Sequence, residues 1–319
     1  MRIFVTGASG FVGGAAAARL AADGHDVRAM SRTEAADRTI ENLGAAPVRC
    51  DLQTVSAEHV GDAEAVLHCA AYVADWGPPD AWYQANVLGT QRMLDAAAGA
   101  GARRFIHMGT EAAIVRGQHI LGADETEPLA LDSPYPYCAT KAEAERRVLA
   151  ANGPEFATIV LRPRFIWGPG DQTILPALEQ MAGSGQFRWL DGGRARTSTT
   201  HIDNLVAAIV LALDRGTPGQ AYFILDDGER TMREVLSGLA ASRGITLPDR
   251  ALPAWLAGAI AAAGESVWRT LRLSGAPPLT RHAVMVMSRD CTLDDSKARR
   301  DLGYQPVVSF EEGLRQMSA

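Results

Sequence analysis

Hydrophobic and polar positions alternate in blocks along the N-terminal half of the chain. An apolar run at 2–6 is followed by a segment of helical composition at 11–22 and by a second apolar run at 26–30. Apolar runs of about four to eight residues, bounded by turn residues, are typical of buried strands. Two such strands joined by a helix lie parallel, so this stretch predicts a βαβ unit of about 30 residues.

The same alternation continues as far as residue 161. Further apolar runs lie at 47–50, 65–69, 104–108 and 157–161, and alanine-rich segments such as 93–100 and 142–150 separate them. Strands that alternate with helices form a parallel sheet that is covered on both faces. The predicted fold class is therefore α/β, with a doubly wound parallel sheet.

Beyond residue 163 the alternation weakens, and clusters of glycine and proline interrupt the chain. Such clusters mark turns and loops. We predict that residues 1–167 and 196–222 build the sheet domain. Residues 168–195 and 223–319 then form a smaller, mostly helical lobe that is interleaved with it.

Composition narrows the range of partners. Of the 319 residues, 47% are hydrophobic and 21% are charged, and the net charge is −6. These proportions are those of an ordinary globular protein. A negative chain without a basic stripe argues against nucleic-acid binding, so we expect the partners to be small molecules.

The cysteines and the uncharged stretches indicate the compartment. Cys50, Cys69, Cys138 and Cys291 are far apart, and no Cys-x-x-Cys pair suggests a metal or redox centre. The N-terminus lacks the apolar segment of a signal peptide. The apolar, uncharged stretch 251–264 is shorter than the roughly 18 residues that a membrane span needs. We expect a cytoplasmic protein with free thiols, no metal and no membrane span.

A glycine-rich turn follows the first strand, where the chain reads Thr6-Gly7-Ala8-Ser9-Gly10-Phe11-Val12-Gly13. A helix N-terminus offers free N–H groups to a pyrophosphate if no side chain blocks the approach. We expect a dinucleotide to contact Gly7, Gly10, Phe11, Val12 and Gly13, which makes the sheet domain a Rossmann-type dinucleotide-binding domain. The alternative is that these glycines only form a tight turn, since their spacing differs by one residue from the common Gly-x-Gly-x-x-Gly.

The end of the second predicted strand bears on the type of dinucleotide. An acidic residue there would favour NAD(H), whereas a 2′-phosphate requires a cation such as Arg. The strand ends in Ser31 and Arg32, so NADP(H) is favoured over NAD(H). The alternative is that Arg32 is only a solvated surface side chain. After the third strand, Asp51 and Leu52 are expected near the adenine.

Three residues indicate the chemistry. Tyr137 and Lys141 lie four residues apart, on one face of a predicted helix, and Thr110 follows a strand. The charge of Lys141 and that of an oxidised nicotinamide would lower the pKa of Tyr137 from about 10. Tyr137 would then be the general acid in ketone reduction, or the base in alcohol oxidation, and Thr110 would donate a hydrogen bond to the substrate oxygen. The alternative for Tyr137 and Lys141 is an ordinary pair of packed helix residues.

Taken together, these motifs resemble those of the extended short-chain dehydrogenase/reductase superfamily over nearly the whole chain. Further matching segments are His68-Cys69-Ala70-Ala71, Asn86-Val87-Leu88-Gly89-Thr90, Leu161-Arg162-Pro163 and Lys297-Ala298-Arg299-Arg300-Asp301-Leu302-Gly303-Tyr304. The resemblance implies hydride transfer at the nicotinamide ring. It also implies that Lys141 holds the nicotinamide ribose, that Ala70 and Ala71 contact the cofactor, and that the backbone near Pro163 contacts the carboxamide.

Within the superfamily, the closest patterns are those of the 3β-hydroxysteroid and sterol dehydrogenases and of the dihydroflavonol reductases. Nucleotide-sugar enzymes usually carry Asn where this chain has Phe165, and sugar dehydratases carry two carboxylates where it has only Glu111. The resemblance therefore implies an apolar alcohol or ketone as substrate. Glu111, Arg164, Phe165 and Trp167 are candidate substrate contacts, and Arg164 could pair with a substrate carboxylate or bond a backbone carbonyl. Gly109 departs from the family, which commonly has Ser there.

Other segments leave alternatives open. An apolar helix within 251–273 could pack in the core of the lobe, line a pocket or touch a membrane surface. Asn86 is expected to anchor a loop near the cofactor, and His201 to pack without a catalytic role. The resemblance also suggests a homodimer formed through helices near 81–101 and 134–152.

The sequence thus predicts an NADP(H)-dependent oxidoreductase that interconverts a secondary alcohol and a ketone on an apolar, steroid-like substrate. A nucleotide-sugar epimerase is the alternative enzyme. A dinucleotide-sensing protein without turnover is an alternative of another class, although the intact Tyr137 and Lys141 argue against it.

Overall fold

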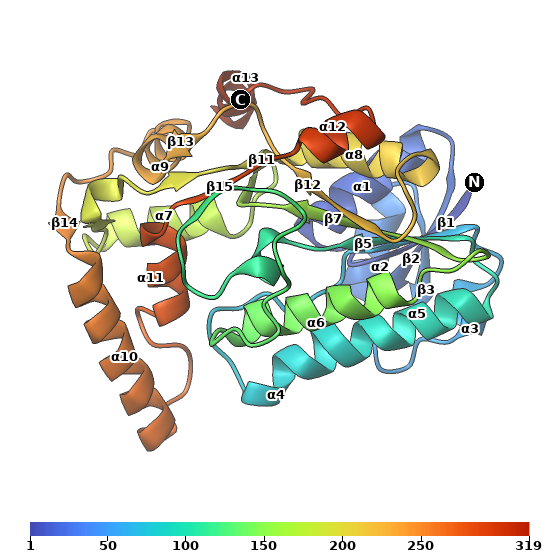
Figure 1. Cartoon of the computed structure of the whole chain (residues 1–319), viewed down its shortest axis with the longest axis horizontal. Coiled ribbons are helices and arrows are strands. Elements are labelled where there is room, and N and C mark those ends of the chain that lie inside the picture. Colours follow the sequence, from blue (N-terminus) through green and yellow to red (C-terminus); the bar gives the residue numbers. More distant parts are fainter. Residues whose placement is uncertain (319) are drawn as a thin grey trace.

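The computed structural model describes residues 1–318, and its centre is a seven-stranded parallel sheet (Figure 1). The strand order is β12-β7-β5-β4-β1-β2-β3. The strands are β1 (Arg2–Thr6), β2 (Asp26–Ser31), β3 (Ala46–Arg49), β4 (Ala65–His68), β5 (Arg104–Met108), β7 (Ala157–Pro163) and β12 (Gln220–Ile224). The predicted doubly wound α/β sheet is confirmed, and six of its strands coincide with the predicted apolar runs to within two residues. The sequence analysis did not identify β12.

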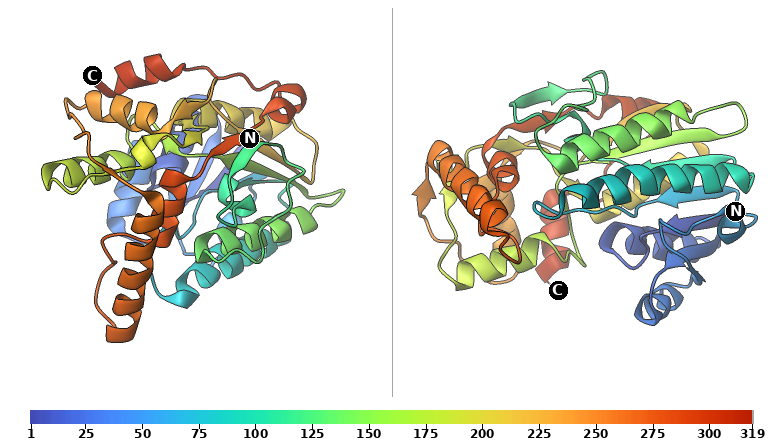
Figure 2. Two further views of the ribbon diagram at one scale, coloured as in Figure 1. Left: turned by 60° about the vertical axis from the view of Figure 1, so that its left-hand side comes forward. Right: turned by 90° about the horizontal axis from the view of Figure 1, so that it is seen from below.

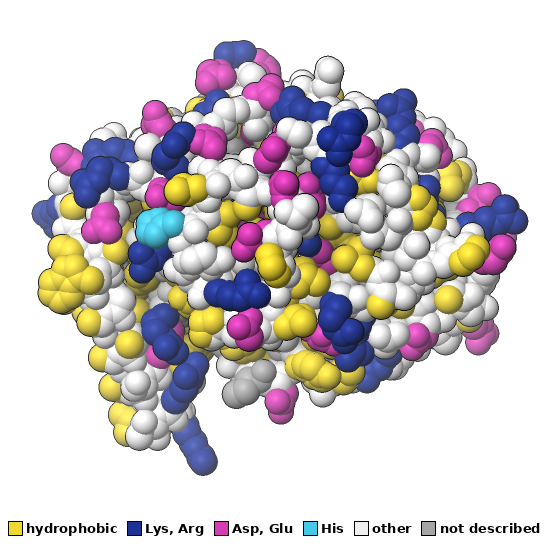
Figure 3. Space-filling view, in the orientation of Figure 1, with side chains coloured by type: hydrophobic (Ala, Val, Ile, Leu, Met, Phe, Trp, Pro, Cys, Tyr) yellow, Lys and Arg dark blue, Asp and Glu magenta, His cyan; other side chains and the backbone are white. Residues whose placement is uncertain are grey.

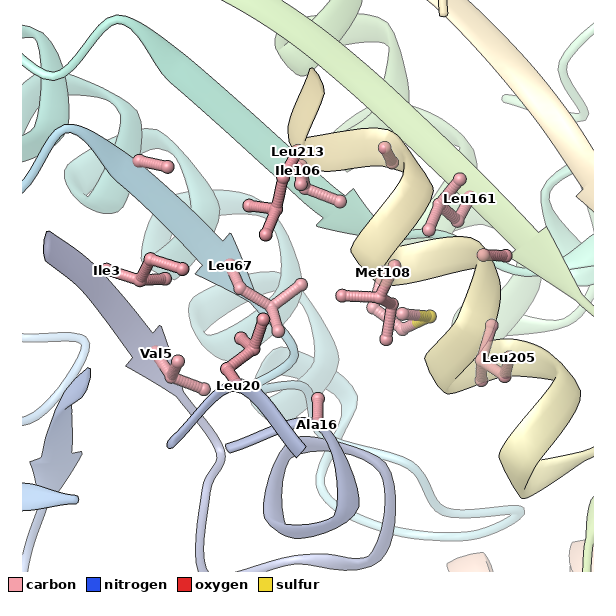
Figure 4. Close-up of a cluster of buried hydrophobic side chains, with 14 of the residues drawn as sticks. Ile3, Val5, Ala16, Leu20, Leu67, Ile106, Met108, Leu161, Leu205 and Leu213 are labelled. Carbon is pink, nitrogen blue, oxygen red and sulfur yellow. The ribbon is translucent and has the colours of Figure 1, made fainter. Parts of the chain in front are cut away.

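Alternating side chains of the strands build two cores, one on each face of the sheet. Ile3 and Val5 of β1 point to one face and pack with α1 (Phe11–Ala22) and α8 (Ile202–Asp214) (Figure 4). Phe4 points to the other face, which is covered by α5 (Gly89–Gly99) and α6 (Pro136–Ala150). This two-sided burial explains why the parallel strands read as continuous apolar runs.

The remaining elements of the sheet domain are short. They are α2 (Glu34–Asn42), α3 (Ala57–Val60), α4 (Pro79–Trp82), the π-helix η1 (Tyr83–Leu88) and the 3₁₀ helix η2 (Glu111–Ile114). The π-helix joins α4 to α5, so residues 79–99 form one continuous helix whose turns are wider over residues 83–88.

A second lobe lies beside the sheet domain (Figure 2). Its four-stranded sheet has the order β13-β10-β15-β6, and two further strand pairs are β8 with β11 and β9 with β14. Its strands are β6 (Ile120–Ala123), β8 (Ile166–Trp167), β9 (Trp189–Leu190), β10 (Arg196–Thr197), β11 (Thr200–His201), β13 (Arg230–Thr231), β14 (Ala251–Leu252) and β15 (Cys291–Leu293). Its helices are α7 (Ile174–Gly183), η3 (Asp191–Gly193), α9 (Met232–Ala241), α10 (Ala254–Leu271), α11 (Arg281–Ser288) and α13 (Phe310–Ser318).

Several segments lie across the predicted division of the chain. The strands β8, β10 and β11 fall in the predicted sheet domain but lie outside the central sheet. β6, which falls in the predicted sheet domain, pairs with β15 of the lobe. Conversely, α12 (Ser296–Asp301) and the residues after it pack on the sheet domain, where Ala298, Leu302 and Tyr304 join the same core as Ile3. The two parts are thus more interleaved than the sequence pattern suggests.

Helix α10 projects from the lobe (Figures 1 and 2). Only a narrow stripe of it, Ala257, Ala261 and Glu265, is buried, whereas Trp255 is 75% and Leu271 64% exposed. Figure 3 shows hydrophobic side chains along this helix and basic ones towards its tip. The helix is therefore not mainly a core element. None of the helices within residues 1–318 is long and apolar enough to cross a membrane.

Candidate active site

The predicted cofactor and catalytic residues meet at the carboxyl edge of the central sheet. Gly7 follows β1, Ala70 follows β4, Thr110 follows β5 and Pro163 ends β7, and these four strands are neighbours in the sheet. Because all of the strands are parallel, their carboxyl ends lie along one edge, where ligands bind in open α/β sheets.

The glycine turn forms a cradle that no larger residue fits. Gly7 has a φ of +75°, and a Cβ there would lie 2.9 Å from the backbone nitrogen of Ala70; a Cβ on Gly13 would lie 2.4 Å from the carbonyl oxygen of Gly7. Gly10 precedes α1 and provides no side-chain cap, so the first N–H groups of the helix face the turn without a side-chain acceptor. The turn therefore fits the pyrophosphate of a dinucleotide.

The end of β2 carries a polar cluster that the sequence analysis identified only in part. Ser31 is buried and donates a hydrogen bond to Asp37, which also accepts one from Arg49. Arg32 is exposed. Against the effect of burial, the pKa of Asp51 is lowered by hydrogen bonds from Gln53 and Thr54 and, after them, by the charge of Arg32. Asp37 and Arg49 were not predicted. Arg49 lies opposite Ser31 in the parallel register of β2 and β3, so the pairing of these strands places Ser31 and Arg49 side by side.

Lys141 lies one helical turn after Tyr137, beneath the end of β5. Its side chain is buried, and its ammonium donates a 2.7 Å hydrogen bond to the backbone oxygen of Met108. Burial lowers the pKa of Lys141 to about 8, against the opposing charge of Glu145. Glu145 in turn forms a buried ion pair with Arg162. Lys141 is thus fixed in place by the sheet and by its own helix.

The groups that act on the pKa of Tyr137 include several that the sequence analysis did not connect with it. Burial, and after it the negative charge of Glu111, raise the pKa of Tyr137, while hydrogen bonding with Thr110 acts in the opposite direction. Among the protein's own groups the main effects raise this pKa, and the lowering expected from Lys141 together with an oxidised nicotinamide stays a prediction.

Glu111 and Arg164 form a partly buried ion pair at the site. The distance between Arg164 Nη1 and Glu111 Oε1 is 2.6 Å, and Arg164 Nε donates to Thr197 at 3.0 Å. The Arg164 side chain is only 3% exposed. Its guanidinium is thus already paired within the protein, which leaves less of it for the predicted substrate carboxylate.

A pocket opens beside Tyr137 between η2 and α11. Most of its wall is apolar and comes from Ala112, Val115, Ile120, Met285 and Val286, and the polar members include Glu111, Arg164 and His282. The contribution of α11 was not predicted. The apolar run 283–287 is the sequence feature that could have indicated helix α11.

His282 connects this pocket to the loop after β4. Its ring meets that of Tyr137 edge-on, with 5.9 Å between the centroids, and its Nδ1 lies 2.6 Å from a carboxylate oxygen of Asp75. Asn86 holds the same loop, since its side chain accepts a hydrogen bond from the Tyr72 N–H and donates one to the Tyr72 oxygen. Asn86 thus has the anchoring geometry that we expected.

Two of the predicted substrate contacts, Trp167 and Phe165, do not line this pocket. Trp167 is fully buried in the core of the lobe with Phe310, and its indole N–H donates to Asp226, so it is not a pocket residue. Phe165 has a φ of +44° and packs partly against the same core. This left-handed turn redirects the chain after β7 and carries Trp167 into the core. His201 is also fully buried, as expected, beside Trp167.

Gly109 illustrates how closely the site is packed. A Cβ at this position would lie 2.6 Å from Cγ1 of Val160 and 3.1 Å from the oxygen of Leu161. Because the β-branched Val160 belongs to a central strand and cannot easily turn away, we expect Gly109→Ser to lower the free energy of unfolding by about 1–3 kcal/mol. Urea titration of Gly109→Ser alone and with Val160→Ala measures this. Full stability of the single variant, or no gain from the second change, would contradict the packing explanation.

Comparison with known proteins agrees with this geometry. Residues 4–254 match the model of the 3-beta hydroxysteroid dehydrogenase/isomerase family. The chain is 40% identical to a 4-hydroxy-2-methyl-3-oxo-4-farnesyl-3,4-dihydroquinoline-1-oxide ketoreductase of Stigmatella aurantiaca, covering 98% of this chain and 95% of the relative. It is also 40% identical to a 2-alkyl-3-oxoalkanoate reductase of Stenotrophomonas maltophilia, covering 100% and 99%.

Among solved structures, the fold matches that of the UDP-glucuronic acid 4-epimerase from Bacillus cereus in complex with NAD. The TM-score is 0.76 at 20% identity, and the match covers 100% of this chain and 97% of the other. At this identity the likeness concerns the fold. The family match and the relatives make the protein an NAD(P)-dependent oxidoreductase of alcohols and ketones with a small-molecule substrate. The chain belongs to the 3-beta hydroxysteroid dehydrogenase/isomerase family, within the extended short-chain dehydrogenases/reductases.

Proposed function

We propose that this protein is an NADP(H)-dependent reductase of an apolar ketone, with Tyr137 as the general acid and, in the reverse direction, the general base. The observation that carries the proposal is the position of Tyr137. It lies at the carboxyl edge of the sheet, next to Thr110 and Lys141, and on the wall of a mainly apolar pocket.

Tyr137, Lys141 and Thr110 each have a separate role in the proposed reaction. A bound nicotinamide cofactor would supply or accept the hydride. Tyr137 would give its phenolic proton to the carbonyl oxygen as negative charge develops there. Lys141, held by Met108, would hold the nicotinamide ribose and keep a positive charge beneath the site. Thr110 would position the substrate oxygen relative to Tyr137.

The pocket supports an apolar substrate with one polar end. Aliphatic side chains form part of its wall, beside charged residues that include Glu111, Arg164 and Arg289, and apolar burial contributes about 25 cal/mol per Å². Both relatives are named for reactions on ketones, one with a farnesyl group and one with alkyl chains. We therefore propose a ketone that carries a long alkyl, prenyl or steroid-like substituent.

Initial rates of NADPH and NADH oxidation with a panel of ketones test the proposal. The panel would contain 2-alkyl-3-oxo acids of increasing chain length, prenylated aryl ketones and 3-ketosteroids, with a UDP-sugar as comparison. We expect turnover with NADPH that rises as the apolar substituent lengthens. Turnover of the UDP-sugar alone, or of no ketone with either cofactor, would contradict it.

The preference for NADP(H) depends on Arg32. We expect Arg32→Ala to raise the Kd for NADPH about 10- to 100-fold and to leave the Kd for NADH nearly unchanged, because only NADPH carries the 2′-phosphate. Binding of both cofactors is measured by fluorescence titration. Arg38→Ala is the control. Arg38 is also an exposed arginine, and its ion pair with Glu34, at 4.0 Å, is long and lies on the surface. Equal losses for both cofactors would contradict the assignment.

A further inference from the structure

The cavity beside Tyr137 is too small to enclose a ketone with a long substituent. Its volume is about 50 Å³, and a single water molecule already needs about 10–15 Å³ of such space. Pockets that enclose a whole organic ligand have volumes of about 300–1,000 Å³. The cavity therefore has room for the carbonyl group and its nearest atoms, and a long hydrocarbon tail has to leave it.

One border of the cavity is polar and does not suit such a tail. Arg289 and Asp290 line the cavity there, and both bond the ring of His119. Gln118 belongs to the same border. A hydrocarbon chain would remove these groups from water without offering them hydrogen bonds, which is costly. The tail is therefore expected to leave the cavity in another direction.

A second way out lies at His282, where an apolar surface groove begins. His282 lines the cavity, and its Nδ1 lies 2.6 Å from a carboxylate oxygen of Asp75. The residues that follow Asp75 form one wall of the groove, which has a volume of about 460 Å³, and the segment between α10 and α11 forms the other. The residues that line the groove carry no charge: Trp76, Gly77, Pro78, Leu273, Gly275 and Ala276.

Specific contacts hold the groove in shape. The guanidinium carbon of Arg269 lies 5.0 Å from the centroid of the Trp76 ring, which ties α10 to the loop after β4. Gly77 lies against Tyr72 and Trp82, and a Cβ at this position would lie 2.5 Å from the Tyr72 hydroxyl oxygen. The loop is therefore packed on the residues beneath it, and the groove is part of the folded structure.

We propose that this groove binds the hydrocarbon tail of the substrate, which reaches it from Tyr137 past the His282–Asp75 pair. The proposal rests on the proposed function in that the substrate is a ketone with a long apolar tail. Asp75 is 52% exposed, so its carboxylate returns to water when the pair parts, and such pairs contribute little to stability. In the groove the tail would cover Trp76 and Leu273, and this burial of apolar surface favours binding.

A brominated probe tests the site without turnover. Bromine quenches indole fluorescence on contact, so a long-chain methyl ketone that is brominated at the end of its chain is added to the protein with NADP⁺. The unbrominated ketone is the blank, and equilibrium dialysis measures binding of the probe. We expect quenching that is largely lost in Trp76→Phe and kept in Trp255→Phe, because Trp255 lies on α10 outside the groove. Equal quenching in the wild type and in Trp76→Phe, or no binding of the probe, would overturn the proposal.

Leu273→Asp tests the groove through turnover. Each methylene that enters an apolar site improves binding by up to about fourfold, and a carboxylate in the groove opposes this. We expect the ratio of kcat/KM for a long-chain methyl ketone to that for a short-chain one to fall by at least about tenfold. Leu131→Asp is the matched control, because Leu131 is a leucine of similar exposure outside the groove, and it should leave the ratio unchanged. An unchanged ratio in Leu273→Asp, or an equal fall in Leu131→Asp, would contradict the assignment.

The two experiments together separate this proposal from the proposed function. Quenching that depends on Trp76, without reduction of any ketone, would support the groove as a binding site for the tail and reject the proposed function. Reduction of long-chain ketones without quenching at Trp76 would support the proposed function and reject the groove. The absence of both quenching and turnover would reject both.

Discussion

Replacing Tyr137 with Phe is expected to lower kcat for ketone reduction by about 10²- to 10⁴-fold, the usual contribution of a positioned general acid. The phenyl ring keeps its place against His282, so only the proton is lost. The Kd for NADPH should change by less than about threefold, because the glycine cradle and the bond from Lys141 to Met108 do not involve the hydroxyl. Stopped-flow and steady-state rates measure kcat, and fluorescence titration measures the Kd.

Tyr135→Phe is the control for this variant. Tyr135 precedes α6 and also packs against the ring of His282, yet its hydroxyl lies near Gly117 and has no part in the proposed proton transfer. Its removal should leave kcat within about threefold of the wild type. A Tyr137→Phe enzyme with nearly full activity would show that another group supplies the proton.

Gly13→Ala is expected to weaken binding of NADPH by at least about 100-fold and to reduce the free energy of unfolding by about 1–3 kcal/mol. The added Cβ would lie 2.4 Å from the oxygen and 2.6 Å from the carbonyl carbon of Gly7. Since both contacts are to backbone, the turn itself must shift, and the N–H groups that would face the pyrophosphate shift with it.

Gly258→Ala provides the comparison for Gly13→Ala. Gly258 also lies in a helix, but a Cβ there would meet no atom within 4 Å. Its replacement should leave the affinity for NADPH unchanged and stabilise the protein slightly, because Ala is the better helix former. If Gly13→Ala bound NADPH as tightly as Gly258→Ala, the glycine turn would not be the pyrophosphate site.

The parts of the structure that follow local rules could be predicted from the sequence. β1 and β5 begin and end where their apolar runs do, because a strand buried on both faces needs such a run and its neighbours in the chain are turns. The glycine cradle could also be identified, since the close contact of Gly13 is with the backbone of Gly7, six residues earlier.

Contacts between distant residues could not be predicted in this way. Glu111 and Arg164 are 53 residues apart, and the pattern around either one does not reveal the other. The same holds for His282 and Tyr137, which α11 brings together from the C-terminal lobe. After burial, the charge of Glu111 raises the pKa of Tyr137, and this effect was not foreseen. The lowering expected from Lys141 together with an oxidised nicotinamide stays a prediction.

The turn after β7 determines where Trp167 lies. The residues after β7 were expected to line the pocket, but the left-handed conformation of Phe165 sends Trp167 into the core, where Asp226 accepts its N–H at 2.8 Å. Helix α10 shows the opposite case. Its apolar residues were compatible with a core helix, yet Trp255, Ile260, Val267 and Leu271 are exposed, and contact with a membrane surface stays a prediction.

Isotope transfer tests the central claim most directly. The protein would be incubated with NADPH deuterated at C4, each stereoisomer in turn, and with a long-chain 2-alkyl-3-oxo acid, and the product analysed by mass spectrometry and NMR. We predict that one of the two stereoisomers delivers a single deuterium to the new carbinol carbon, and that Tyr137→Phe slows this transfer by about 10²- to 10⁴-fold. Oxidation of NADPH without deuterium at that carbon, or a full rate of transfer in Tyr137→Phe, would contradict the account.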